Sequence, residues 1–274
     1  MTTKEQTVAE SWLPSEEECS QCHDVIAEQW ARSRHHSSFQ NPDFARSWAR
    51  EPLAFCRDCH APALQRLPPL PDAEAESLGV GCLDCHLEGN TLVTSGSPKE
   101  ASAAPHALRK SPEFATQSCA RCHEFAFPAK TWRPAGTLMQ LTMTEHAASQ
   151  HASRSCSECH MQGHDHSFAS TRDPEAMRRA LEVTARRKGS ALELDLTPVG
   201  VGHAFPTGDL YRRLEVHAEL VSAEGEQLAT ATRYLARHFE PRRRPDGRLN
   251  YAARLPTPDD RLRGPTTLRL ELGV

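Results

Sequence analysis

All ten cysteines and five of the fifteen histidines of the chain fall into one repeated pattern, C-x-x-C-H. The pattern occurs as CSQCH at 19–23, CRDCH at 56–60, CLDCH at 82–86, CARCH at 119–123 and CSECH at 156–160. Two thiols three residues apart on one helical turn can each add to a vinyl group of the same porphyrin. The histidine that follows can then bind the iron. The spacing therefore predicts five covalently attached haem c groups.

This interpretation assigns a role to every residue of the pattern. The thioether bonds would come from Cys19, Cys22, Cys56, Cys59, Cys82, Cys85, Cys119, Cys122, Cys156 and Cys159. The proximal iron ligands would be His23, His60, His86, His123 and His160. A zinc site joins two distant ligand pairs, and a disulfide framework needs only an even number of cysteines. Neither alternative explains why a histidine follows the second cysteine every time.

A six-coordinate haem iron needs a second imidazole. Ten histidines remain for this role, at positions 35, 36, 106, 146, 151, 164, 166, 203, 217 and 238. His217 falls on the polar face of a predicted strand together with Glu215 and Glu219, so we expect it to be exposed. His238 also lies in a predicted strand and stays unassigned.

Four further segments resemble a known group of proteins. WARSRH at 30–35 is similar to the W-x-x-S-x-H of multihaem cytochromes related to hydroxylamine oxidoreductase and to its tetrahaem electron acceptor. CHEF at 122–125 and CHM at 159–161 continue the likeness. GVGHAFPTG at 200–208 resembles the G-H-x-F-P-T-G loop of the β-domain appended to many such proteins.

The resemblance implies distal ligands at three positions. His35 matches the histidine of W-x-x-S-x-H, with His36 as the alternative. His106 precedes the fourth motif where relatives often place a ligand. His166 begins HSF, similar to the family's H-x-F ending, and is preferred over His164.

Local context adds two more candidates. His203 lies between Gly202 and Phe-Pro in a loop where no strand face explains a histidine, and glycine permits close approach to a ring. His146 and His151 compete for the fifth place, and His146 is preferred.

The hydrophobic pattern changes near residue 180. Before it, Pro- and Ala-rich segments predict loops and short helices, with helices expected at 24–34 and 173–180. After it, alternating residues predict a hairpin around Lys188-Gly189 and strands at 214–221, 228–239 and 266–272. We therefore expect an α+β fold: a mostly helical or irregular domain wrapped around haems at 1–178, and a small β-sandwich-like domain at 179–274.

Charge and hydropathy bound the environment. The net charge is −4, and acidic residues prevail before residue 175 while basic residues prevail slightly after it, which gives no indication of nucleic-acid binding. No apolar run is long enough for a transmembrane segment. Haem c attachment normally occurs outside the cytoplasm, so we expect a periplasmic or extracellular protein. The first residues, MTTKEQTVAESW, do not read as an export signal.

The motifs favour an electron carrier over a catalyst. Nitrite-reducing relatives often use a lysine-ended motif, whereas all five motifs here end in His. Hydroxylamine-oxidising relatives use a cross-linked tyrosine, and the three tyrosines here all follow residue 210. We expect mostly bis-His haems relaying electrons between a redox protein donor and acceptor, with self-assembly into a haem conduit as a further hypothesis. The alternative is an oxidoreductase in which one open haem acts on a small nitrogen compound or peroxide.

Overall fold

The computed structural model describes residues 15–66, 70–96, 106, 108–126, 138–168, 173–243 and 245–272. It divides into two compact units. The first, here called the helical unit, comprises Met1–Cys119 and Ser155–Ala169, and the second, the β-rich unit, comprises Ala120–Arg154 and Ser170–Val274. The fold is mixed α+β, as expected. The domain boundary between 178 and 179 stays a prediction.

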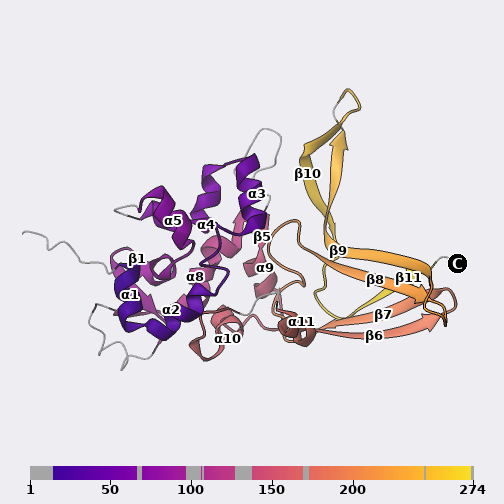
Figure 1. The fold of residues 1–274 in the computed structure, drawn as a ribbon, viewed down its shortest axis with the longest axis horizontal. Helices are drawn as coiled ribbons and strands as arrows, with labels where there is room; N and C mark the ends of the chain where they lie inside the picture. The colour runs from indigo at the N-terminus through magenta and orange to yellow at the C-terminus, as the bar shows by residue number, and fades with distance from the viewer. Residues whose placement is uncertain are drawn as a thin grey trace, which may run out of the picture. The chain divides into compact units, whose positions relative to one another are not determined.

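The helical unit is built from short helices joined by loops (Figure 1). Its α-helices are α1 (Glu16–Cys22), α2 (Asp24–Ala31), α3 (Pro42–Arg50), α4 (Arg57–His60), α5 (Asp72–Leu78), α6 (Cys82–His86) and α10 (Cys156–His160). Helix α8 (Phe114–His123) begins in this unit and ends in the other. Three 3₁₀ segments, η1 (Ala54–Cys56), η2 (Pro62–Gln65) and η3 (Gln162–His164), complete the set.

Side-chain caps define where several of these helices begin. Ser15 and Ser155 form capping boxes at the starts of α1 and α10, each with a glutamate three residues on. Asn41 caps α3, whose first residue is Pro42. The helix expected at 24–34 is confirmed as α2, although it ends at Ala31.

A small sheet in the helical unit follows the third motif. It consists of β1 (Leu87–Glu88), β2 (Thr91–Thr94) and β3 (Leu108–Lys110), with β2 antiparallel to β1 and parallel to β3. The sequence did not predict these strands because each is too short to show an alternating pattern.

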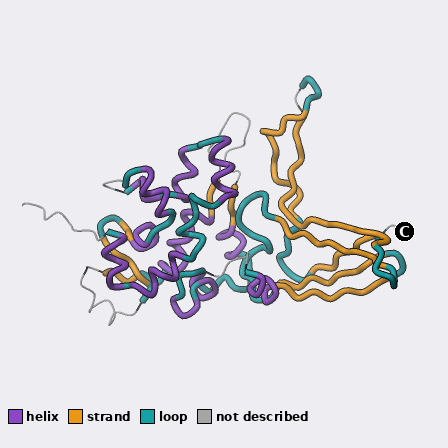
Figure 2. The backbone as a smooth tube through the Cα atoms, in the orientation of Figure 1, coloured by secondary structure: helices purple, strands orange, loops and turns teal. Residues whose placement is uncertain are grey.

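The β-rich unit carries the longer strands. Its elements are β4 (Glu124–Ala126), β5 (Leu138–Leu141), α9 (Thr142–Ala147), α11 (Pro174–Ala180), β6 (Leu181–Lys188), β7 (Ala191–Pro198), β8 (Arg213–Val221), β9 (Gln227–Arg243), β10 (Leu249–Asp259) and β11 (Thr266–Glu271). Strands β6 to β11 form two three-stranded sheets, ordered β11-β7-β6 and β10-β9-β8, and β4 pairs with β5 (Figure 2).

The predicted elements of this unit are confirmed. Asp173 caps α11, and its side chain accepts a hydrogen bond from the Glu175 backbone. The β6–β7 hairpin turns at Gly189, whose positive φ of 63° suits glycine. Strands β8, β9 and β11 match the three expected ranges to within four residues at each end.

The two larger sheets contribute to one hydrophobic core. Its buried members are Leu194, Leu196, Phe205, Ala218, Leu235, Leu262, Leu270 and Leu272. The largest fully buried side chains of the β-rich unit are Leu196 and Leu262, which are 2% and 1% exposed. Burial of such side chains is the main stabilising term for a unit of this kind.

The structure contains no helix with the length and apolar character of a membrane span among its described residues. The N-terminal stretch that bears on the export signal lies outside the described residues.

Candidate haem sites

Every C-x-x-C-H motif lies at the end of a helix. Helices α4, α6, α8 and α10 end at the histidine of their motif, and α1 ends one residue before it. One helical turn therefore presents both cysteines and leaves the histidine at the helix C-terminus. This is the local geometry that double thioether attachment needs.

Two motif histidines are oriented by backbone carbonyls. The Nδ1 atom of His86 donates to the Val93 carbonyl oxygen at 2.9 Å, and that of His60 donates to the Ser38 carbonyl oxygen at 2.9 Å. A carbonyl can only accept, so Nδ1 carries the proton in each ring. Nε2 is then the nitrogen whose lone pair can bind a metal, as is usual for metal-binding histidines.

Three candidate distal ligands show the same arrangement. Nδ1 of His36 donates to the Leu78 carbonyl at 3.1 Å, that of His166 to the His164 carbonyl at 2.7 Å, and that of His203 to the Ala204 carbonyl at 3.0 Å. These backbone contacts leave Nε2 as the nitrogen with a free lone pair in these rings too.

The rings of His86 and His166 lie together within the helical unit. Their centroids are 6.3 Å apart, and their planes differ by 25°. Burial is the main cause that lowers the pKa of both rings, and nearby histidines lower it further, which favours the neutral form. A metal–imidazole bond is about 2 Å long and the ring centroid lies about 1 Å further, so two imidazoles on one iron have centroids about 6 Å apart. The observed separation matches that value.

A buried ionic network holds the first and third motifs together. The Glu16 carboxylate accepts from the backbone N–H groups of Cys82 and Leu83 at 2.8 and 3.3 Å, which caps α6 from a distant helix. Arg66 lies 2.7 Å from both Glu16 and Asp84. Two short helices that each carry a motif are thereby joined through side chains rather than through a conventional apolar core.

Cysteines of different motifs are neighbours in the helical unit. A hydrogen bond with Cys19, followed by burial, raises the pKa of the Cys82 thiol. A hydrogen bond with Cys156, followed by burial, does the same for Cys119. The attachment points of the first and third motifs, and those of the fourth and fifth, are therefore adjacent.

The W-x-x-S-x-H segment is anchored to the residues just before the third motif. The Trp30 indole N–H donates to the Val80 carbonyl at 2.8 Å, and the Val80 N–H donates to the His35 carbonyl at 2.9 Å. Ser33 is 2% exposed, and its hydroxyl accepts from the His36 N–H. The tryptophan and serine thus fix the backbone that carries His35 and His36.

The structure brings His35 close to the H-x-F ending. The ring of Phe168 lies 4.3 Å from that of His35 in an edge-to-face contact and 6.2 Å from that of His166. The His166 N–H also donates to the Gln29 side chain at 3.0 Å. Two segments predicted to supply distal ligands therefore meet in the helical unit.

Among the remaining candidates, His106 and His151 each have a buried ring nitrogen that lacks a hydrogen-bond partner among the described residues. These nitrogens are Nδ1 of His106 and Nε2 of His151. A buried unsatisfied nitrogen is costly, and an iron ligand bond would satisfy Nε2 of His151 directly. Of the competing pair His146 and His151, this observation favours His151.

Both members of that pair pack on the Gly202 backbone in the β-rich unit. A Cβ atom at Gly202 would lie 3.2 Å from the His146 ring and 3.2 Å from Cβ of His151. The neighbours of this glycine are therefore two candidate ligands. The next residue, His203, is the third.

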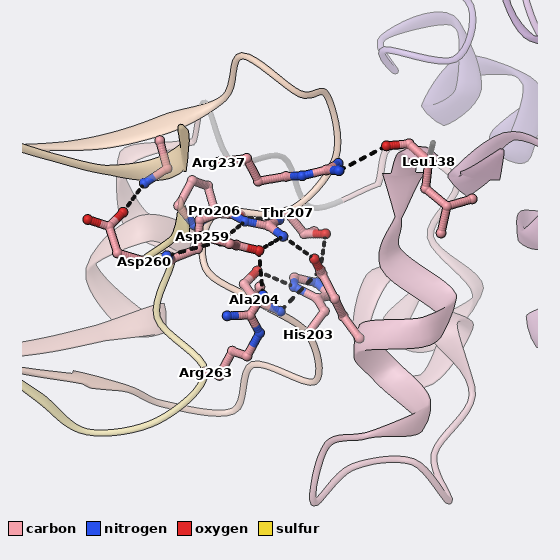
Figure 3. Close-up of polar contacts among 12 residues, drawn as sticks. Leu138, His203, Ala204, Pro206, Thr207, Arg237, Asp259, Asp260 and Arg263 are labelled. Carbon is pink, nitrogen blue, oxygen red and sulfur yellow. Dashed lines mark hydrogen bonds and ion pairs between the residues drawn. The ribbon is translucent and has the colours of Figure 1, made fainter. Parts of the chain in front are cut away.

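The loop that follows His203 is fixed by a buried ion pair (Figure 3). Glu145 accepts from the Thr207 hydroxyl at 2.5 Å and from the Ala204 N–H at 3.3 Å. Its other oxygen lies 2.5 Å from Arg261, and both side chains are at most 3% exposed. Opposite charges at such depth are stable only when paired in this way.

The remaining two histidines take part in contacts away from these groups. His217 is exposed, as predicted, and contacts Thr232 at 2.8 Å and Glu219 at 3.1 Å. His238 lies 2.7 Å from Asp260.

The packing of the helical unit fits the haem interpretation. One buried hydrophobic cluster of this unit consists of Ala61, Ala63 and Ala75, with four larger side chains only partly buried against it. The buried apolar residues that the structure describes in this unit outside this cluster are Val80, Leu83, Leu92, Val93 and Phe114. Such a cluster among the described residues buries little apolar area. Porphyrins held by the five motifs would supply the missing apolar contacts.

The sequence did not reveal the charged residues that position these sites. Glu16, Arg66, Glu145 and Arg261 make their contacts with residues 18 to 116 positions away. No local sequence pattern marks such distant partners. Only Gly202 indicated close packing in this region.

Comparisons with known proteins agree with this picture. Residues 18–87 match the model of the family described as cytochrome c554 and c-prime. The chain is similar in structure to a penta-heme cytochrome c552 from Thermochromatium tepidum, with a TM-score of 0.72 and 21% sequence identity, over 94% of this chain and 87% of that chain. No curated protein matches the chain. The family match over the first motifs and the shared fold together support a multihaem c-type cytochrome.

Proposed function

We propose that the protein is a pentahaem c-type cytochrome that relays electrons between a redox protein donor and acceptor. Five covalent haems with mostly bis-His irons would be held by a helical domain wrapped around them, and a β-sandwich-like domain would follow in the chain. Haem supplies one-electron chemistry, and the protein sets ligation, orientation and access.

The geometry of His86 and His166 carries this proposal. Both rings donate Nδ1–H to carbonyls, and their separation suits two ligands of one iron. An iron with two imidazole ligands has no open position for a substrate, so it transfers electrons only.

The other proposed distal ligands are His35 or His36, His106, His203, and His146 or His151. The carbonyl contacts support His36 and His203, and the buried Nε2 atom supports His151. His35, His106 and His146 remain candidates by their positions in the sequence.

Cellular location and assembly are also part of the proposal. Haem c attachment favours a periplasmic or extracellular protein. Self-assembly into a conduit would require a histidine of one copy to complete a haem of another, and a surplus histidine such as His164 would suit that role.

Electron paramagnetic resonance of the oxidised protein tests the proposal. We expect low-spin ferric signals from bis-His haems with little high-spin iron. A high-spin fraction near one iron in five would instead favour the oxidoreductase with an open haem.

A further inference from the structure

The ion pair between Glu145 and Arg261 lies beside the candidate ligands of the β-rich unit but takes no part in ligation. Glu145 directly precedes His146 in α9, and Arg261 follows the end of β10. The pair is almost fully buried, with side chains 3% and 2% exposed. A buried ion pair offsets the cost of removing its charges from water only when further hydrogen bonds satisfy both side chains.

Three of those further contacts involve the loop that carries His203. Arg261 donates to the Pro206 carbonyl at 3.2 Å and to both oxygens of Asp259 at 2.9 and 2.8 Å. One carboxylate oxygen of Glu145 accepts hydrogen bonds from the Thr207 hydroxyl and the Ala204 N–H, and the other accepts from Arg261. Both oxygens therefore have partners. The ion pair therefore ties α9 to residues 204–207 on one side and to Asp259 on the other.

A second contact fixes the segment before α9. Arg237 donates to the carbonyls of Leu138 and Met139 at 2.9 and 3.0 Å (Figure 3). Strand β5 is thus held by Arg237 of β9, and the helix after it is held by Arg261, which follows β10. His146 and His151 are in turn pressed against Gly202, next to His203.

We propose that the Glu145–Arg261 ion pair is a positioning clamp that fixes the imidazoles around Gly202 for binding to haem iron. This inference rests on the proposed function. Glu145 and Arg261 act through the histidines and touch no iron themselves. Their role is to keep α9 and the 203–207 loop in register, so that imidazole ligands do not need to be ordered when iron binds.

Variants of the full-length haem-loaded protein test the clamp. Glu145→Ala removes the carboxylate, Thr207→Val removes one hydrogen bond to it, and Glu175→Ala removes an exposed ion pair with Arg178 as the control. We expect Glu145→Ala to keep its covalent haems but to convert low-spin iron to high-spin at one haem or more. Added imidazole should restore the low-spin signal. Glu145→Ala should also shift the midpoint potential of a haem. Thr207→Val should shift that potential in the same direction, with a smaller loss of low-spin signal. Glu175→Ala should change neither the potential nor the spin state.

The outcomes separate the clamp from the proposed function. Unchanged spin state and potentials in both Glu145→Ala and Thr207→Val would overturn the clamp and leave the cytochrome assignment intact. If Glu145→Ala fails to fold, an unchanged Thr207→Val overturns the clamp, and a shifted one supports it. A wild-type protein without covalent haem would overturn the proposed function itself.

Discussion

The imidazoles of His86 and His166 lie 6.3 Å apart, although 80 residues separate them in the chain. His86 ends the third motif, and His166 belongs to the loop after the fifth. Each ring is held by its own carbonyl contact, so their relation is built into the polypeptide. If both rings bind one iron, as proposed, the segment after the fifth motif would supply the second ligand of the haem attached to the third.

Replacement of His166 by alanine should leave one iron without its second imidazole. We expect all five haems to remain attached, because His166 belongs to no motif. One of five irons should become high-spin, and added imidazole should reverse the change. Optical and electron paramagnetic resonance spectra of the oxidised protein measure this.

His217→Ala is the matched control for that variant. His217 is exposed and bound to Thr232 and Glu219. Its removal should leave the spin state unchanged. A His166→Ala protein with the wild-type spectrum would exclude His166 as a ligand.

Glu16→Ala should destabilise the helical unit. The variant loses the cap of α6 and one partner of Arg66, which leaves buried donors unsatisfied. The expected loss in the free energy of unfolding is about 1–3 kcal/mol. Thermal or denaturant unfolding measures it. The exposed neighbour gives the control, since Glu17→Ala should change stability by no more than about 0.5 kcal/mol. Equal effects of the two variants would argue against the cap.

Gly79→Ala should be more costly than Gly189→Ala. Both glycines have positive φ, 68° and 63°, so each alanine costs about 1–2 kcal/mol in backbone strain. At Gly79 the new Cβ would also overlap the carbonyl oxygens of His35 and His36, whereas Gly189 has open space. Denaturant unfolding of the two variants compares the costs. Similar losses in the free energy of unfolding would contradict a steric clash of the new Cβ with the backbone at residues 35 and 36.

Stability should fall in acid partly through Asp259. Burial would raise its pKa, but hydrogen bonds and charge from Arg261 and Arg263 lower it to about 2. The unfolded-state pKa is about 3.9, so the contribution is complete above that value and is lost as the pH falls toward 2. Asp259→Asn should lack this component. Denaturation midpoints of the wild type and of Asp259→Asn, measured from about pH 6 to about pH 2, give the difference in stability. Parallel curves would contradict the assigned ion pair.

The sequence predicted the parts of this fold that depend on local chemistry. Gly189 between two alternating runs identified the β6–β7 hairpin, and Asp173-Pro174 identified the start of α11. The C-x-x-C-H spacing placed each motif on a helical turn, which the five helices confirm. Each of these features involves residues within a few positions of one another.

Features that depend on distant residues were not predictable in this way. The parallel pairing of Leu92 with Leu108 follows no alternating pattern, because both strands are very short. The preference for His35 over His36 could not draw on the Leu78 carbonyl, which lies more than 40 residues away. The Glu145–Arg261 pair spans 116 positions and leaves no sequence signal.

The intact mass of the purified protein tests the central claim most directly. Thioether bonds survive denaturation, so the account predicts a mass equal to the polypeptide plus five haems. A polypeptide with no added haem and ten reactive cysteine thiols would contradict it.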